Sequence, residues 1–163
     1  ALARRPRLRD HLAGGVEERR AGALGAPRLQ DGALAVGGDV EAADKYIAPK
    51  YTIRHDPGDP WEGQALDVAT YKERVRTLRA AFPDQFFDIQ GLFADGDAVV
   101  MTWLWSATHQ GDIPGFPATG KRITMSGATA YFFQGDQFVG HWQITDRLGV
   151  FQQLQMAKAG AQA

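Results

Sequence analysis

The longest regular pattern of apolar residues predicts a helix from about Asp67 to Ala81. Apolar residues recur there in three- and four-residue steps, the spacing that gives an α-helix one buried face. A proline shortly afterwards, in Phe82-Pro83-Asp84, ends the helix. The buried stripe consists of Val68, Tyr71, Val75, Leu78 and Phe82, and the basic residues Lys72, Arg74, Arg76 and Arg79 are expected mainly on the other faces.

Beyond this helix the chain alternates between apolar and polar residues, a pattern that predicts β-strands. Asp95-Gly96-Asp97 and Gln134-Gly135-Asp136 have the composition of tight hairpin turns. Hairpins that follow one another in this way predict an antiparallel meander. The expected strands are Phe86 to Ala94, Ala98 to His109, Lys121 to Phe133 and Gln137 to Thr145.

Upstream of the long helix, two short helices and one strand are expected. Arg28 to Val36 is weakly helical, and Asp39 is a suitable N-cap for a helix over Val40 to Ala48, which Pro49 would end. Tyr51 to His55 alternates as a half-buried strand and leads into a turn-forming run through Pro60. This order of elements predicts an α+β fold, with helices on one face of a strongly curved sheet and a concave cavity between them.

The first part of the chain, residues 1–27, has a different composition from the rest. It is rich in Arg, Ala, Leu and Gly and contains no aromatic residue. We interpret it as an extension that packs little, with room for a short helix around Val16 to Ala23. One domain is therefore expected over residues 28–157, followed by a tail at residues 158–163.

Composition narrows the classes of function. The 163 residues carry a net charge of −1 with a pI near 6.5, so no overall positive field favours nucleic acid or an anionic membrane as a partner. The absence of cysteine excludes disulfides and thiolate metal sites and suits a reducing cytoplasm. No apolar run approaches the roughly 20 residues that span a bilayer. A cytoplasmic protein that binds a small molecule is expected.

Several short motifs, in this order, resemble those of SnoaL-like polyketide cyclases, also called the ester cyclase family, over roughly Gly37 to Leu154. The resemblance implies the nuclear-transport-factor-2-like fold, a cone-shaped α+β barrel whose mostly antiparallel sheet wraps around two to three N-terminal helices. The sequence departs from the pattern where Gly22, Gly25, Pro27 and Gly32 interrupt the first helix. The motifs are Tyr51-xxx-His55-Asp56-Pro57, Phe82-Pro83-Asp84, Thr108-His109-xx-Asp112-xx-Gly115-xx-Ala118-Thr119-Gly120-Lys121 and His141-Trp142-xxx-Asp146-xx-Gly149.

Asp146 is the first candidate for a catalytic residue. Strand alternation places Trp142, Ile144 and Asp146 on one face, where lost hydration would raise the pKa of the carboxyl group toward a range useful for proton transfer. From the residues alone, capping of the following Asp-Arg-Leu-Gly turn is the better interpretation. The resemblance favours catalysis, because it implies an acidic residue at this position that acts as general acid/base in an intramolecular aldol closure without metal or cofactor.

His55 is the second catalytic candidate, since a neutral imidazole can donate a hydrogen bond to an enolate oxygen or tune Asp146. An equal alternative is that His55 only forms hydrogen bonds within its own turn.

The aromatic residues fit either a pocket for a flat substrate or an ordinary core, and the loop with Phe116 could shape the cavity mouth. The residues predicted to contact the substrate are Tyr51, Trp103, Trp105, His109, Phe116, Tyr131, Trp142 and Ile144.

Two classes of function stay open at this point. The first is a cofactor-independent cyclase, or a related isomerase or hydrolase, acting on a hydrophobic small molecule that carries carbonyl groups. The second is a non-catalytic binding or dimerisation module on the same fold. The resemblance also implies a homodimer formed through the outer sheet face, to which Leu104, Phe132, Phe138 and His141 could contribute. The histidines lack the spacing of metal ligands, so no metal site is expected.

Overall fold

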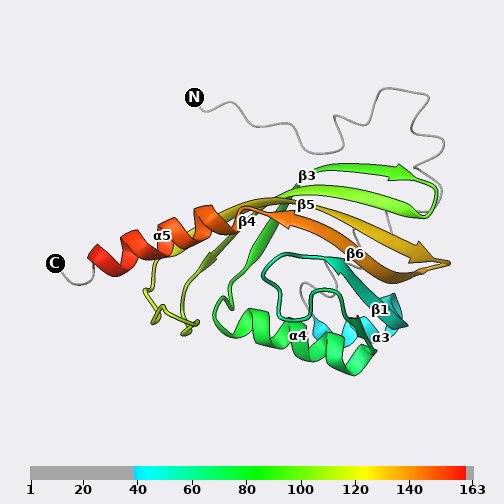
Figure 1. The fold of residues 1–163 in the computed structure, drawn as a ribbon, viewed down its shortest axis with the longest axis horizontal. Coiled ribbons are helices and arrows are strands. Elements are labelled where there is room, and N and C mark those ends of the chain that lie inside the picture. Colours follow the sequence, from blue (N-terminus) through cyan, green and yellow to red (C-terminus); the bar gives the residue numbers. More distant parts are fainter. Residues whose placement is uncertain (1–38, 161–163) are drawn as a thin grey trace.

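A curved six-stranded sheet forms the centre of this computed structural model, which describes residues 39–160. Figure 1 shows helix α4 beneath the sheet and helix α5 beyond its end. This is the mixed α+β architecture that the sequence predicts. In chain order the elements are η2 (Val40–Ala42), α3 (Ala43–Tyr46), β1 (Ile47–His55), β2 (Ala65–Leu66), α4 (Val68–Ala80), β3 (Phe86–Asp95), β4 (Ala98–Thr108), β5 (Arg122–Gln134), β6 (Gln137–Thr145) and α5 (Arg147–Gly160).

The sheet order is β2-β1-β6-β5-β4-β3. Strands β3 to β6 form the predicted antiparallel meander, and their ends agree with the sequence expectation to within a residue. Gly96 and Gly135 occupy the hairpin turns with φ of 54° and 57°, a conformation that favours glycine. Strand β1 joins the far side of β6 in parallel, so the first and last long strands of the described chain are neighbours.

Strand β4 shows how the sheet separates its two faces. Val99, Met101, Trp103, Trp105 and Ala107 alternate along it, and all are buried. Their side chains share the face that α4 covers, where the core lies. The intervening residues are half-buried or exposed, so the opposite face of the sheet is open.

Helix α4 confirms the predicted long helix. Asp67 caps it, with Oδ1 accepting a hydrogen bond from the backbone N of Thr70 at 2.7 Å. Val68, Tyr71, Val75 and Phe82 of the predicted stripe pack against the core, whereas Leu78 is 43% exposed. The expected placement of the basic residues needs one correction, because Arg74 is buried, 9% exposed, and turns inward. Buried aspartates on the neighbouring turn provide the reason, described below.

The region before β1 differs from its prediction. Asp39 acts as an N-cap, as expected, but the helix over Val40 to Ala48 is reduced to η2 and α3. Strand β1 already begins at Ile47, which pairs with Phe138 of β6. Pairing with the sheet therefore overrides helix propensity here, and Pro49 lies within a stretch where the pairing register is irregular.

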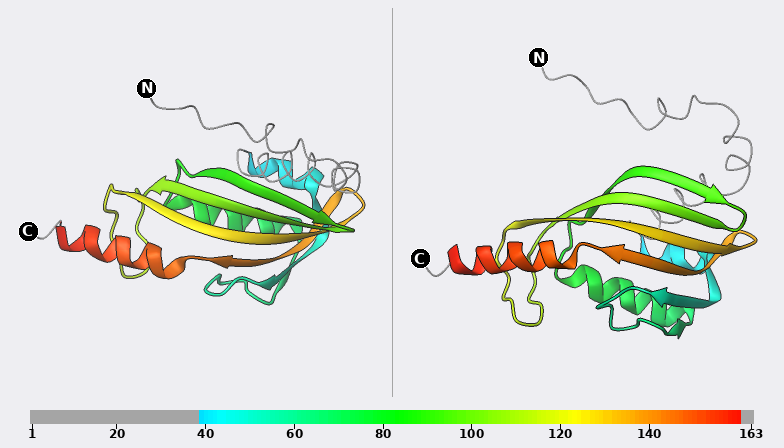
Figure 2. Two further views of the ribbon diagram at one scale, coloured as in Figure 1. Left: turned by 90° about the horizontal axis from the view of Figure 1, so that it is seen from above. Right: turned by 45° about the horizontal axis from the view of Figure 1, so that its top comes forward.

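Helix α5 was not predicted. It runs on from the end of β6 and lies beside β5 (Figure 2). Leu154 is buried on its inner side, while Leu148 and Met156 are exposed. The helix reaches Gly160, inside the segment that was predicted to be a tail.

The predictions for residues 1–27, for the short helix over Val16 to Ala23 and for the helical stretch over Arg28 to Val36 lie outside the described residues. The predicted domain boundary at residue 28 lies there as well. Among the helices of residues 39–160, none is long and apolar enough to cross a membrane.

Candidate functional site

A largely apolar cavity of about 700 Å³ lies between the inner face of the sheet and helix α4. Its volume is in the range of small-molecule sites. The apolar lining comes from α4 (Tyr71, Val75, Leu78, Phe82), from β1 (Ile47), from the meander (Phe87, Trp103, Trp105, Met125, Tyr131, Phe138), from the loop after β4 (Ile113, Pro114, Phe116) and from α5 (Val150, Phe151, Leu154).

One polar wall of the cavity is built where β1 ends, and a β-bulge determines which side chains face it. Ile53 pairs with His141 and His55 pairs with Trp142, so β1 has one residue more than β6 over this step. An extra residue reverses the alternation of side chains. As a result His55 turns to the outer face and Asp56 turns inward, where it is 1% exposed.

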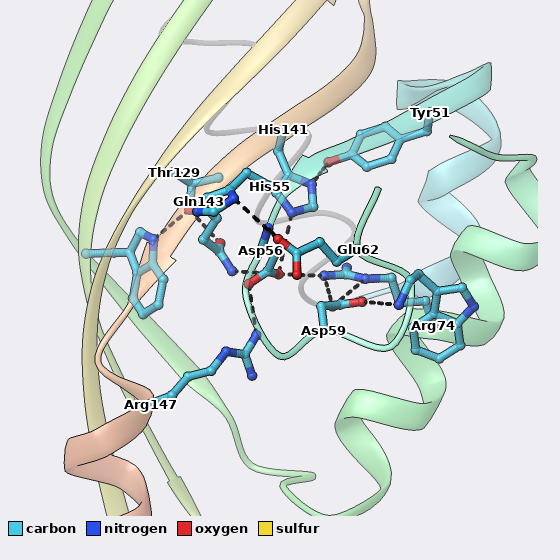
Figure 3. Close-up of polar contacts among 12 residues, drawn as sticks. Tyr51, His55, Asp56, Asp59, Glu62, Arg74, Thr129, His141, Gln143 and Arg147 are labelled. Atoms are coloured by element: carbon cyan, nitrogen blue, oxygen red, sulfur yellow. Dashed lines mark hydrogen bonds and ion pairs between the residues drawn. The ribbon is translucent and has the colours of Figure 1, made fainter. Parts of the chain in front are cut away.

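Asp56 is held by donors from three directions (Figure 3). Its Oδ1 accepts a hydrogen bond from Arg147 Nη2 at 2.8 Å. Its Oδ2 accepts from Gln143 Nε2 at 3.1 Å and from Arg74 Nη2 at 3.3 Å. His141 Nε2 lies 3.6 Å from the same oxygen. The carboxylate is thus surrounded by positive or hydrogen-bonding groups from β6, α4 and α5.

These partners decide the ionisation of Asp56. Burial alone would raise its pKa, but the neighbouring His141 and Arg147 outweigh that effect and lower the pKa to about 2. Asp56 is therefore an anion at any ordinary pH. A buried anion with several donors is stable, whereas the same anion without them would be costly.

Arg74 belongs to a second, tighter ion pair in the same wall. Its Nε and Nη2 both donate to Oδ2 of the buried Asp59, at 2.9 and 2.6 Å. Asp59 also accepts from the backbone N of Trp61 at 2.8 Å, which closes the turn after β1. The inward direction of Arg74 follows from this pairing, because a buried carboxylate requires a compensating charge.

His141 links the polar wall to the core. Its Nδ1 lies 2.7 Å from the hydroxyl of Tyr51, a fully buried group whose pKa is raised well above its usual value by burial. The hydroxyl therefore stays protonated and can donate to Nδ1, while Nε2 faces Asp56. The expectation that His141 lies at the surface or in a dimer interface is wrong, since it is 3% exposed and on the inner face. Phe138, expected at the same interface, is equally buried.

Asp146 does not lie in an apolar pocket, contrary to the sequence expectation. Trp142 and Ile144, on the same side of β6, are 41% and 53% exposed, so this face of the strand is the outer one. Asp146 is exposed and caps α5, with Oδ1 accepting from the backbone N of Gly149 at 2.8 Å. Its main-chain carbonyl accepts the first helical hydrogen bond, from Val150. The capping interpretation therefore describes the geometry of this residue.

His55 also lies away from the cavity. Its ring stacks on the indole of Trp142 with centroids 5.0 Å apart. Its Nδ1 lies 3.3 Å from Oε1 of Glu62, and both side chains are more than one-third exposed. His55, Trp142, Ile144 and Asp146 thus occupy the outer face or its edge, apart from the polar wall.

The other predicted contact residues divide into two groups. Trp103, Trp105, Tyr131 and Phe116 line the cavity. Tyr51 and His109 are buried behind it. The ring of His109 stacks on Phe82, and its Nδ1 lies 3.2 Å from Thr119 Oγ1. Across residues 39–160, no group of three or more His, Asp or Glu side chains is arranged to hold a metal ion.

Sequence reasoning did not identify Asp56, Gln143 or Arg147 as members of one site. In the sequence, Asp56 is marked only as part of a turn-forming run and of the motif Tyr51-xxx-His55-Asp56-Pro57, in which His55 is the predicted candidate. The one local signal in this run is Gly58, which has a φ of 88° and lies under the Arg147 side chain, so that a Cβ there would come within 3.2 Å of Arg147 Cδ. The bulge that turns Asp56 inward depends on pairing with β6 and leaves no mark in the sequence of β1.

Comparisons with known proteins agree on one family. The family described as SnoaL-like polyketide cyclase matches residues 29–154. A candidate polyketide cyclase from Acidithiobacillus ferrooxidans is 72% identical, with a TM-score of 0.77, over 80% of this chain and 94% of that one. IdmH, a candidate polyketide cyclase from Streptomyces antibioticus, is 26% identical, with a TM-score of 0.65, over 77% of this chain and 93% of its own.

A third solved structure shares the fold but carries a different description. AclR, a candidate hydroxylase from Streptomyces galilaeus, is 22% identical with a TM-score of 0.64, over 78% of each chain. No curated protein matches the chain.

Proposed function

Because the chain belongs to the SnoaL-like polyketide cyclase family, we propose that it catalyses an intramolecular aldol-type ring closure on a polyketide-like small molecule. One observation carries the proposal: a cavity lined by aromatic rings has a buried carboxylate, Asp56, in its polar wall. Aromatic walls suit a flat, carbonyl-rich ligand, and the carboxylate supplies a group that can accept a proton.

The proposed reaction assigns Asp56 the role of general base. Asp56 takes a proton from the carbon between two carbonyl groups, and the electron pair of that C–H bond moves onto a carbonyl oxygen to give an enolate. The enolate carbon attacks a further carbonyl group elsewhere in the same molecule and forms the new C–C bond. The resulting alkoxide then recovers the proton from Asp56. The cavity contributes by holding the two reacting carbons together in a water-poor space.

The low pKa of Asp56 limits which substrates this base can serve. With a pKa of about 2, the carboxylate is a weak base as long as its partners hold it. The proposal therefore requires an already acidic carbon, such as a methylene flanked by two carbonyls. Asp146, the base expected from the sequence, enters the proposal differently, as the cap of the helix that carries Arg147.

Replacing Asp56 by Asn tests this function, since the amide keeps the shape of the side chain but cannot accept the proton. Linear poly-β-carbonyl compounds are incubated with each variant, and cyclised products are quantified by mass spectrometry. We expect Asp56→Asn to lower turnover by roughly 100-fold or more, while Asp88→Asn, which alters an exposed aspartate outside the cavity, retains it. Equal turnover in both variants would remove Asp56 from the mechanism.

A second candidate function is a non-catalytic module that binds the same class of ligand. The saturated hydrogen bonding and low pKa of Asp56 favour it, because both features also suit a purely structural carboxylate. Under this alternative, ligands bind with no product formed by the wild-type protein. An isomerase or hydrolase reaction would differ from ring closure in its products, which the same measurement distinguishes.

We also propose a cytoplasmic location, which the absence of cysteine suits.

A further inference from the structure

Two arginines contact Asp56, and they differ in how firmly they are held. Arg74 is 10% exposed at its side chain and gives two hydrogen bonds to Asp59, so its guanidinium is fixed whether or not Asp56 is present. The Arg147 side chain is 46% exposed and gives Asp56 a single hydrogen bond, at 2.8 Å. Arg147 is therefore the partner that can leave Asp56 most easily.

Asp56 remains compensated if Arg147 leaves. Gln143 and Arg74 still donate to its Oδ2, and His141 still faces it. A buried carboxylate that loses its last partner is destabilised by several kcal/mol, but one that keeps a cation and other donors avoids most of this cost. Exchange of Arg147 for another contact is thus compatible with the fold.

The position of Arg147 makes it accessible to a ligand. It is the first residue of α5, fixed there by the Asp146 cap, and it lines the cavity. Its stem lies over Gly58, whose missing side chain leaves the room that Cδ and Nε occupy. The guanidinium therefore reaches the polar wall from the solvent side, with donors left over after its one bond to Asp56.

We propose that Arg147 determines ligand specificity by exchanging Asp56 for an anionic oxygen of the ligand, either a carboxylate or an enolate. The inference rests on the proposed function for the cavity as a ligand site, and it adds the charge of the ligand. An arginine fork matches a carboxylate or enolate better than a neutral carbonyl, because charge-assisted hydrogen bonds are the stronger ones. During ring closure, the same exchange would hold the enolate oxygen while freeing Asp56.

Binding of two matched probes tests the exchange without any turnover. The probes are 2-naphthoate and its neutral analogue 2-naphthamide, measured by isothermal titration calorimetry at pH 7. We expect the wild-type protein to bind the anion about tenfold more tightly, the size of one charge-assisted hydrogen bond over a neutral one. Arg147→Gln should bring the two affinities to within about twofold. The control, Arg76→Gln, removes an exposed arginine that pairs with Glu41 outside the cavity and should keep the preference.

Asp56→Asn should change the affinity in the opposite direction to Arg147→Gln. It removes the carboxylate that competes with the ligand for Arg147, so 2-naphthoate should bind this variant more tightly than the wild-type protein. Circular dichroism confirms that each variant is folded. If Arg147→Gln does not fold, Arg147→Met, which also removes the charge, replaces it. Three outcomes would overturn the inference. They are equal affinities of the wild-type protein for 2-naphthoate and 2-naphthamide, no binding of 2-naphthoate, and an anion preference that persists in Arg147→Gln. If the wild-type protein shows the anion preference but no ring-closing activity, only the proposed function is contradicted.

Discussion

At the scale of single residues, Asp56 shows that the environment of a side chain in the fold can differ from what its local sequence indicates. In the sequence it is the second residue of a turn-forming run. In the fold it is a buried anion shared among Arg147, Gln143 and Arg74. Because its partners lie on three other elements, its lowered pKa is a property of the folded state only. This has a consequence for stability in acid.

Acid should destabilise the folded chain between about pH 4 and pH 2 through Asp56. Its pKa is about 2 when folded and near 3.8 when unfolded, so the stabilisation is complete above pH 4 and is lost as the pH falls through the folded value. The gap corresponds to about 2 kcal/mol of unfolding free energy. Urea denaturation of the wild-type protein and of Asp56→Asn, at a series of pH values, measures it.

The two denaturation series should converge as the pH falls, since a protonated Asp56 resembles the amide. Asp88→Asn, at an exposed site, should follow the wild-type protein at every pH. A constant difference between wild type and Asp56→Asn down to pH 2 would mean that Asp56 does not carry this dependence.

The choice of candidate residues shows what the sequence can and cannot indicate at this scale. The aromatic lining residues Trp103, Trp105 and Tyr131 were identified, because apolar alternation and cavity walls coincide in this fold. Asp146 and His55 were assigned to the wrong face. Alternation defines which residues share a face but not which face is inside, and here both faces of β6 carry aromatic or aliphatic groups.

At the scale of elements, α5 connects the end of β6 to the polar wall. Asp146 lies between β6 and α5. Its backbone N donates to the carbonyl of Ser126 on β5, and its side chain caps α5. Arg147 follows directly and points to Asp56. Capping thus sets both the start of the helix and the place of the guanidinium.

Asp146→Ala should destabilise the protein by about 1 kcal/mol, because it leaves the backbone N of Gly149 without its capping acceptor. Asp146→Asn, which caps equally well, should stay close to wild type in both stability and turnover. Denaturant unfolding and the product assay together measure the two effects. A large loss of turnover in a stable Asp146→Asn variant would instead support a catalytic carboxylate at this position.

The elements differ in how far the sequence predicts them. The four long strands and α4 were predicted closely, because their alternation, glycine turns and helical stripe are local signals. The short helix before β1 and the bulge after Ile53 were not, since both result from pairing with β6. Helix α5 was missed because its apolar residues form a narrow stripe next to exposed Leu148 and Met156.

At the scale of the whole molecule, the outer sheet face presents apolar side chains in adjacent rows. Val100, Ala130 and Trp142 are cross-strand neighbours, and Thr102, Ala128 and Ile144 form the next row. Leu104 lies one row further along and is 45% exposed. Such a face on a free protein indicates an interaction surface.

We predict that this face forms a homodimer interface, and sedimentation velocity measures the mass of the particle. Ile144→Lys should yield a monomer, because two lysines would be brought into an apolar contact. Met156→Lys, at a position 69% exposed on α5, serves as a control that should remain dimeric. A wild-type monomer at micromolar concentration would contradict the prediction.

The parallel pairing of β1 with β6 also determines the order in which the molecule can be completed. Tyr51 and His141 are 90 positions apart in the chain, and Asp56 and Arg147 are 91 apart. Contacts of such long range are slow to form, since the entropy of a large loop is lost before they are gained. During synthesis, Asp56 cannot form its hydrogen bond to Arg147 until the ribosome has added that residue, 91 positions later. The hairpins can form early, but the polar wall can be assembled only as one of the last steps of folding.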